Sequence, residues 1–155
     1  MNTYEQKVSE FLNQKAIAIA GVSRNPQGSV GNGIYRKFKD SGYNIYPVNP
    51  NAEVIEGDKC FPNLKSIPEK IDAVFIATSP AVSTEIVKQS IEGGVKTIWF
   101  HRGMGNGSFS EEAAKLGEEN GLKVIRGGCP MMYISKVDPF HKMMHFFMKL
   151  FGKLK

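Results

Sequence analysis

The sequence predicts an α/β protein with a doubly wound, mainly parallel sheet of about five strands and a C-terminal amphipathic helix. Short apolar runs alternate with segments of helical periodicity, which is the pattern of βαβ units. The runs at 16–22 and 72–78 are apolar almost throughout, as in strands buried on both faces of a parallel sheet. The first run leads directly into a glycine-rich turn and then into a helical segment. These three observations define the fold class.

The predicted elements follow one another at short intervals. Helices are expected at 3–14, 31–41, 80–92 and from 110, and strands at 16–22, 44–48, 72–78, 96–100 and 123–125. Gly42 and the pair Gly93-Gly94 end two of the helices, because glycine suits the residue after a helix end. Ser79 and Pro80 supply an N-cap and a first-turn proline for the third helix. Strands joined by such helices form right-handed βαβ units in a Rossmann-like sheet.

In such a sheet the ligand lies beyond the carboxyl ends of the strands, where the strand order switches. The candidate loops are 23–31, 49–51, 78–82, 100–107 and 127–131. The first loop is the most informative, because a strand, a small-residue loop and a helix N-terminus together form a cradle for an anion. Ser23 and Arg24 are hydroxyl and guanidinium donors to a phosphate, or else exposed loop residues. A phosphate-bearing ligand is therefore predicted here.

The first loop departs from two common phosphate-binding motifs. Gly21-Val22-Ser23-Arg24 lacks the G-x-G-x-x-G spacing, and no Gly-Lys-Ser/Thr closes the loop as in a Walker A motif. A Rossmann NAD site also needs an acidic residue near the end of the second strand. Val48-Asn49-Pro50 stand at that place, and the nearest acid, Glu53, comes after the proline. This counts against NAD, although variant NAD sites exist.

The other loops hold polar and thiol groups that each have two interpretations. Thr78 and Ser79 either line a ligand groove or serve the helix start. His101 lacks an identifiable orienting partner for a catalytic base, which favours a surface histidine. Cys129 has no evident source of a lowered pKa, which favours a structural or ligand-packing role, and Cys60 is expected to be structural too. With no triad, metal-ligand cluster or carboxylate pair in the sequence, no catalytic residue and no metal site are assigned.

Composition and charge narrow the class further. The chain has 155 residues, 41% of them hydrophobic, which fits one globular domain. Five lysines and one aspartate from residue 136 onward carry +4 of the net charge of +5, so the main domain lacks the charge of a nucleic-acid binder. The two cysteines show neither disulfide nor zinc spacing. A polar N-terminus without a signal-peptide core, and no apolar run near the roughly 20 residues of a membrane span, predict a cytoplasmic protein.

Several segments share their pattern with one known family. They are Gly21-Val22-Ser23-Arg24, Gly28-Ser29-Val30-Gly31, Ile45-Tyr46-Pro47-Val48-Asn49-Pro50-Asn51, Ala77-Thr78-Ser79-Pro80-Ala81 and Gly128-Cys129-Pro130. Together, over residues 10–135, they resemble the coenzyme A-binding domain family. That domain stands at the start of the succinyl-CoA synthetase alpha subunit and of ADP-forming acetyl-CoA synthetases. The Tyr-Pro-Val-Asn-Pro run, followed by Val-Ile-Glu-Gly, is the most specific piece, and the small size resembles stand-alone bacterial members.

The resemblance implies coenzyme A (CoA) as the cofactor and a pose for it. The phosphates are expected over the first loop, the nucleotide portion at the ends of the second and fourth strands, and the pantetheine arm between the third and fifth. The implied contact residues are Gly21, Val22, Ser23, Arg24 and Val30 in the first loop; Val48, Asn49, Pro50, Phe100 and His101 for the nucleotide; and Thr78, Ser79, Pro80, Cys129 and Pro130 for the pantetheine.

Two departures from the family limit what is carried over. Larger relatives often place a lysine after the Asn-Pro turn, where this chain has Asn51, so one phosphate contact is in doubt. The chain is also expected to end where the synthetases begin the domain with their phosphorylated histidine, so ligase activity is not transferred. The expected function is a small cytoplasmic protein that binds CoA or an acyl-CoA without catalysis of its own. An NAD(P)-dependent oxidoreductase and the CoA-binding component of a two-chain acyl-CoA ligase stay open as alternatives.

Residues 136–155 are expected to form a basic amphipathic helix that follows a CoA-binding domain at 1–135. On a helical wheel the apolar face holds Phe140, Met143, Met144, Phe147, Leu150, Phe151 and Leu154, and the polar face holds His141, Lys142, His145, Lys149 and Lys153. Packing against the domain or a second copy of it is favoured, and the alternative is a membrane surface or another partner. The expected partners are thus a small-molecule ligand and contacts made through this helix, with no nucleic acid and no transmembrane segment.

Overall fold

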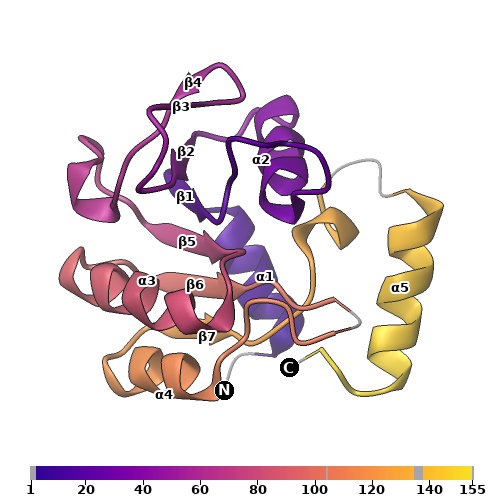
Figure 1. Ribbon diagram of the computed structural model, residues 1–155. Helices are drawn as coiled ribbons and strands as arrows, with labels where there is room; N and C mark the ends of the chain where they lie inside the picture. Colours follow the sequence, from indigo (N-terminus) through magenta and orange to yellow (C-terminus); the bar gives the residue numbers. More distant parts are fainter. Residues whose placement is uncertain (1–2, 104, 135–137, 155) are drawn as a thin grey trace.

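A five-stranded parallel sheet forms the centre of the molecule in the computed structural model, which describes residues 3–103, 105–134 and 138–154 (Figure 1). The strands lie in the order β2-β1-β5-β6-β7. Their bounds are β1 Ile17–Ala20, β2 Ile45–Val48, β5 Ala73–Ile76, β6 Thr97–Phe100 and β7 Lys123–Ile125. The predicted Rossmann-like α/β fold is confirmed. The strand β7 has the predicted bounds, and each of the other four strands is shorter than predicted by at least one residue.

Helices cover both faces of this sheet (Figure 1). The helices are α1 Tyr4–Leu12, α2 Val30–Asp40, α3 Pro80–Glu92, α4 Glu111–Glu119 and α5 Pro139–Leu150. Side chains of α1, α2 and α5 share one core cluster, and side chains of α3 and α4 share the other. For α2, α3 and α4 this segregation follows from the topology, because right-handed crossovers on the two sides of β1 pass over opposite faces of the sheet. Helices α1 and α5 connect no neighbouring strands and add to the α2 side.

Alternating side chains of the strands feed these two cores. Ile17 and Ile19 of β1 point to the α1 side, where Phe11 and Trp99 pack edge to face with ring centroids 5.2 Å apart. Ala18 and Ala20 point to the α3 side. All four β1 residues are fully buried, which explains the continuous apolar run in the sequence.

Three short elements were not predicted. They are the antiparallel hairpin of β3 Val54–Ile55 and β4 Asp58–Lys59 and the single 3₁₀ turns η1 Leu64–Ser66 and η2 Pro130–Met132. A two-residue strand shows no alternation of apolar and polar residues, so periodicity cannot reveal it. The hairpin lies beside the end of β2, where Phe61 donates its N–H to the carbonyl of Pro47 at 3.0 Å.

Helix α5 packs on the domain, as favoured, but only partly through the predicted face, from which Met144 and Leu154 contact the core. Met144 and Met148 are buried in the α1-side core, and the His145 ring lies against Tyr133 with centroids 5.1 Å apart. Most of the predicted apolar face is exposed instead: Phe140, Met143, Phe147, Leu150 and Phe151. Histidine, assigned to the polar face, can pack on aromatic rings through its apolar body. The predicted domain boundary at 135/136 lies outside the described residues.

Candidate functional site

Two glycines bring the first loop close to the neighbouring strand. Gly21, directly after β1, has φ +101°, and a Cβ there would lie 2.4 Å from the carbonyl carbon of Ala77, at the end of β5. A Cβ on Gly31, in the first turn of α2, would lie 2.2 Å from the carbonyl oxygen of Gly21. Only glycine fits at both positions. The N-terminus of α2 is thereby held against the switch point of the sheet, between β1 and β5.

Asn32, a residue that the sequence analysis did not select, shapes this loop. Its buried side chain accepts the backbone N–H of Ser23 at 2.6 Å and the hydroxyl of Ser29 at 2.7 Å. The amide nitrogen of Asn32 donates to the carbonyl of Ser23 and to Glu56 Oε1, each at 2.9 Å. Glu56 also pairs with Arg36 at 2.8 Å. The short spacing of Ser29 and Asn32, typical of a helix N-cap with a polar partner, was the available signal.

Asn49 holds the same loop from the β2 side. Its amide nitrogen donates to the carbonyl of Val22 at 2.8 Å, and its Oδ1 accepts the backbone N–H of Asn51 at 2.8 Å. Asn49 stands where an NAD site places its acidic residue, and its side chain is turned into the loop. The predicted ligand residue therefore also has a structural role, while Pro50 next to it is exposed.

After the end of β5, the hydroxyl of Ser79 is exposed and is not used to cap the following helix. Ser79 is at the N-cap position of α3 with Pro80 behind it, yet its side chain makes no capping hydrogen bond and is exposed. Thr78 Oγ1 lies 3.0 Å from the buried hydroxyl of Ser83, which itself lies 2.8 Å from the carbonyl of Ser108. Ser79 is thus free for another role, and Thr78 is fixed by the scaffold.

At the end of β6 the two predicted residues differ in access. Phe100 is fully buried and packs edge to face on Phe109 at 5.8 Å. His101 is half-buried against Phe75, rather than a surface residue as favoured from the sequence. Burial lowers the pKa of His101, and the nearby His141 of α5 lowers it further. A neutral imidazole at this edge can donate or accept one hydrogen bond without adding charge.

The loop after β7 carries a thiol of low reactivity. Cys129 is buried, and burial raises the pKa of its thiol to about 11. Gly127 before it accepts the indole N–H of Trp99 at 2.8 Å and the hydroxyl of Tyr4 at 3.1 Å. Pro130 is buried and begins η2. These contacts fit the packing role that the sequence favoured for Cys129, since the thiolate is the reactive form.

Arg24 is the cation that the first loop offers. Arg24 is exposed and has no ion-pair partner among the described residues, and Val30 in the first turn of α2 is 49% exposed. The N–H groups at the start of α2 lie at the other end of the same loop, whose Ser23 is hydrogen-bonded to Asn32 of α2. An unpaired guanidinium next to a helix N-terminus suits a phosphate group.

The predicted residues lie in one row along the carboxyl edge, in the order of the strands. Asn49 follows β2, Ser23 and Arg24 follow β1, Thr78 follows β5, His101 follows β6, and Cys129 follows β7. The two nucleotide segments, after β2 and β6, are separated by β1 and β5, which corresponds to about 14 Å at about 4.8 Å per strand. An adenine ring cannot touch both, but an extended ligand can follow the whole row.

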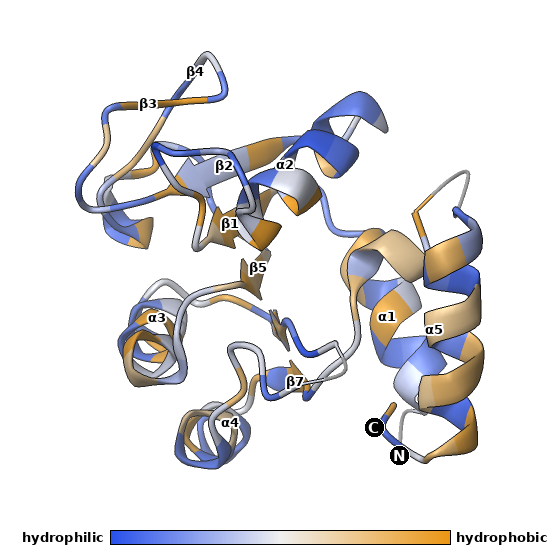
Figure 2. Cartoon of the chain, turned by 45° about the vertical axis from the view of Figure 1, so that its right-hand side comes forward, coloured by the Kyte–Doolittle hydropathy of each residue, from blue (hydrophilic) through white to orange (hydrophobic). Residues whose placement is uncertain are grey.

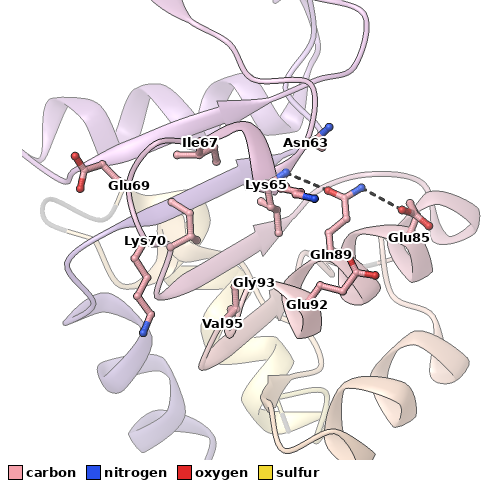
Figure 3. Close-up of a pocket in the computed structure, with 12 residues that line it drawn as sticks. Asn63, Lys65, Ile67, Glu69, Lys70, Glu85, Gln89, Glu92, Gly93 and Val95 are labelled. Carbon is pink, nitrogen blue, oxygen red and sulfur yellow. Dashed lines mark hydrogen bonds between the residues drawn. The ribbon is translucent and has the colours of Figure 1, made fainter.

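Two cavities bear on where a ligand lies. One of about 820 Å³ lies after β2, between the Pro50 turn and the β3–β4 hairpin, with Glu53, Lys59 and Cys60 in its wall. Another, of about 530 Å³, is lined by the segment around η1 and by α3, where Gln89 accepts the N–H of Leu64 and donates to Glu85 (Figure 3). None of the predicted site residues lines this second cavity, which lies toward the amino ends of β5 and β6.

The fold and this edge define a class: α/β proteins with an anion cradle at the switch point of a parallel sheet. Comparison with known proteins identifies the family within this class. The family model of the CoA binding domain matches residues 15–135, and the chain belongs to this family. The resemblance noted in the sequence is thereby confirmed.

Relatives of this family include both large and small proteins. The ADP-forming acetate–CoA ligase II of Archaeoglobus fulgidus is 34% identical over 106 residues, which are 67% of this chain and 15% of the ligase. The uncharacterized protein YneT of Bacillus subtilis is 29% identical over 129 residues, which are 83% of this chain and 92% of YneT. The structure of a hypothetical protein from Pyrococcus horikoshii matches with a TM-score of 0.74 at 34% identity, covering 83% of this chain and 87% of that one.

The described residues contain neither a membrane-spanning helix nor a cluster of metal ligands. Within 3–103, 105–134 and 138–154, no helix has the length and apolar character to cross a membrane. The same residues contain no group of three or more histidine, cysteine or acidic side chains arranged to hold a metal ion.

Proposed function

We propose that this protein binds coenzyme A or an acyl-CoA along the carboxyl edge of its sheet, as a small cytoplasmic binding protein without catalysis of its own. The observation that carries the proposal is the α2 N-terminus, held at the switch point by Gly21 and Gly31 with Arg24 unpaired beside it. Such a cradle suits a diphosphate. Membership of the CoA binding domain family supports CoA as the ligand.

The pose follows the row of loops. The nucleotide occupies the cavity after β2, next to Pro50, and the diphosphate lies over Ser23 and Arg24. The pantetheine arm passes the free hydroxyl of Ser79 and the neutral ring of His101, and its thiol ends near Cys129. Compared with the pose implied by the family resemblance, the proposal assigns His101 to the arm instead of the nucleotide, because β1 and β5 lie between β2 and β6.

A thermal-shift comparison of CoA, acetyl-CoA, NAD, NADP and ATP tests the proposal. A ligand at about 100 times its dissociation constant adds roughly 2.7 kcal/mol to the free energy of unfolding. We expect a clear rise of the melting temperature with CoA and acetyl-CoA and none with NAD or NADP. Stabilisation by NAD or NADP without an effect of CoA would contradict the proposal and favour the oxidoreductase.

The CoA-binding component of a two-chain acyl-CoA ligase is the second candidate. It is favoured by relatives such as the subunit alpha of an ADP-forming acetate–CoA ligase II of Pyrococcus furiosus, 29% identical over 130 residues. This chain spans 27% of that subunit. Release of ADP from ATP with acetate and CoA, measured for the chain alone and with a partner ligase subunit added, distinguishes the candidates. A non-catalytic binder is expected to release none in either case, whereas release only with the partner subunit would favour the ligase component, and release by the chain alone would contradict non-catalytic binding.

A further inference from the structure

An exposed apolar strip runs along α5. Its six large side chains are each 40–66% exposed: Phe140, Met143, Phe146, Phe147, Leu150 and Phe151. They are the majority of the large hydrophobic side chains that the described part of the chain exposes. Helix α5 lies at the periphery, beside α1, with much of its surface turned away from the sheet (Figures 1 and 2). Contiguous apolar surface of this kind marks an interaction site in a folded protein.

The opposite side of α5 packs against the domain. The exposure of the strip is therefore a fixed feature of the folded protein. Met144 and Met148 are buried in the core, and Lys149 pairs with Glu5 of α1 at 3.2 Å. Asp138 caps the helix by accepting the backbone N–H of His141 at 3.0 Å. The domain therefore fixes α5 with its apolar strip facing outward.

Charge indicates what covers the strip. From Pro139 to Leu154 the sequence has three lysines and no acidic residue. Lys142 and Lys153 have no ion-pair partner within the part of the chain that the structure describes. A second copy packing α5 on α5 would bring these lysines together without an acid from either helix to pair with them. An anionic surface with an apolar interior meets both the lysines and the strip.

We infer that α5 is an interfacial membrane anchor, which inserts its exposed apolar strip into an anionic lipid surface while Lys142 and Lys153 meet the headgroups. The α5 segment also borders the ligand edge through its inner side: His141 lies near His101, and Leu154 lies 3.5 Å from the position of a Cβ on Gly128. The exposed strip lies on the outer side of the helix, so the membrane contact is a second function beside the proposed ligand binding.

Flotation of the full chain with lipid vesicles tests this inference. We expect binding to vesicles of phosphatidylcholine with one quarter phosphatidylglycerol, weak binding to phosphatidylcholine alone, and loss of binding at high salt. Phe146→Ser with Leu150→Ser should reduce binding at least tenfold, since both side chains are more than 60% exposed and their loss leaves the core intact. Lys142→Glu should weaken it about fivefold or more.

Two control variants test whether vesicle binding is specific to α5. Val82→Ser removes an exposed apolar side chain of α3, and Lys115→Glu reverses an exposed lysine of α4; neither should change vesicle binding. Circular dichroism checks that each variant is folded. No vesicle binding, or binding that survives Phe146→Ser with Leu150→Ser, would overturn the inference. A dimer in sedimentation equilibrium that this double variant dissociates, without vesicle binding, would assign the strip to a second copy.

Discussion

Asn32 shows how much one buried amide can decide in this protein. It accepts the N–H of Ser23 and donates to the carbonyl of the same residue, which fixes the backbone where the phosphate is proposed to lie. Through Glu56 it also joins the loop to the β3–β4 hairpin. The hairpin, which contributes no residue to the predicted set, thereby supports the shape of the cradle.

Replacing Asn32 with alanine should destabilise the protein and weaken CoA binding. The change removes the partner of the N–H and of the carbonyl of Ser23, both part-buried, at a cost of about 1 kcal/mol for each hydrogen bond. Urea unfolding measures the change in the free energy of unfolding. Asn120→Ala is the control, because Asn120 is exposed and only donates to Leu116. Equal stability of the two variants would show that the network does not shape the loop.

Arg24→Ala should weaken CoA binding by about tenfold or more without changing stability. A charge-assisted hydrogen bond contributes about 1.5–3 kcal/mol, and the exposed Arg24 side chain has no structural contact to lose. Calorimetric titration with CoA measures the affinity. Lys65→Ala, in the wall of the cavity near η1, should leave the affinity unchanged. The reverse result would place the phosphates in that second cavity.

His101 should make the free energy of unfolding depend on pH below about 7. Unfolded histidine titrates near 6.5, and burial lowers the pKa of His101 in the native state. Between the two values the unfolded chain binds more protons, so the free energy of unfolding is highest above about 6.5 and falls as the pH is lowered. Urea unfolding across this range should show a flatter profile for His101→Gln. Parallel profiles for the two proteins would contradict the shift.

At the scale of elements, the sheet could be predicted because its strands are buried on both faces. The runs at 16–22 and 72–78 became β1 and β5, and the topological rule placed the candidate loops on one edge. The hairpin at β3 and β4 could not be predicted, since two-residue strands carry no periodicity. The packing face of α5 was predicted only in part, because Met148 was left out of both predicted faces and the His145 ring packs against Tyr133.

The two glycines of α2 provide a matched test of the contact between this helix and β1. Gly31→Ala should destabilise by about 2 kcal/mol or more, because its Cβ would lie 2.2 Å from the carbonyl oxygen of Gly21. Gly33, two residues later, has nothing within 4 Å of such a Cβ. Gly33→Ala should therefore stabilise the helix by up to about 1 kcal/mol. Thermal unfolding of both variants checks the difference, and a destabilised Gly33→Ala would mean that crowding is not the cause.

At the scale of the whole molecule, the two proposed functions belong to two separate surfaces. The carboxyl edge of the sheet, where we propose the ligand to bind, holds the α2 N-terminus, Arg24 and the row of loops. Helix α5, whose two lysines carry +2 of the net charge of +5, presents an apolar strip on the periphery. The sequence predicted the first surface from strand order and glycines, and it predicted the chemistry of the second without its orientation.

The position of bound CoA tests the account most directly, and a heteronuclear NMR titration of the amide signals measures it. We expect CoA to shift amides of residues 21–31, 77–80 and 127–130, which belong to separate loops that meet at the carboxyl edge. Amides of residues 63–71 and 85–95 should stay in place. Shifts confined to these latter segments, around the cavity between η1 and α3, would contradict a CoA site at the switch point of the sheet.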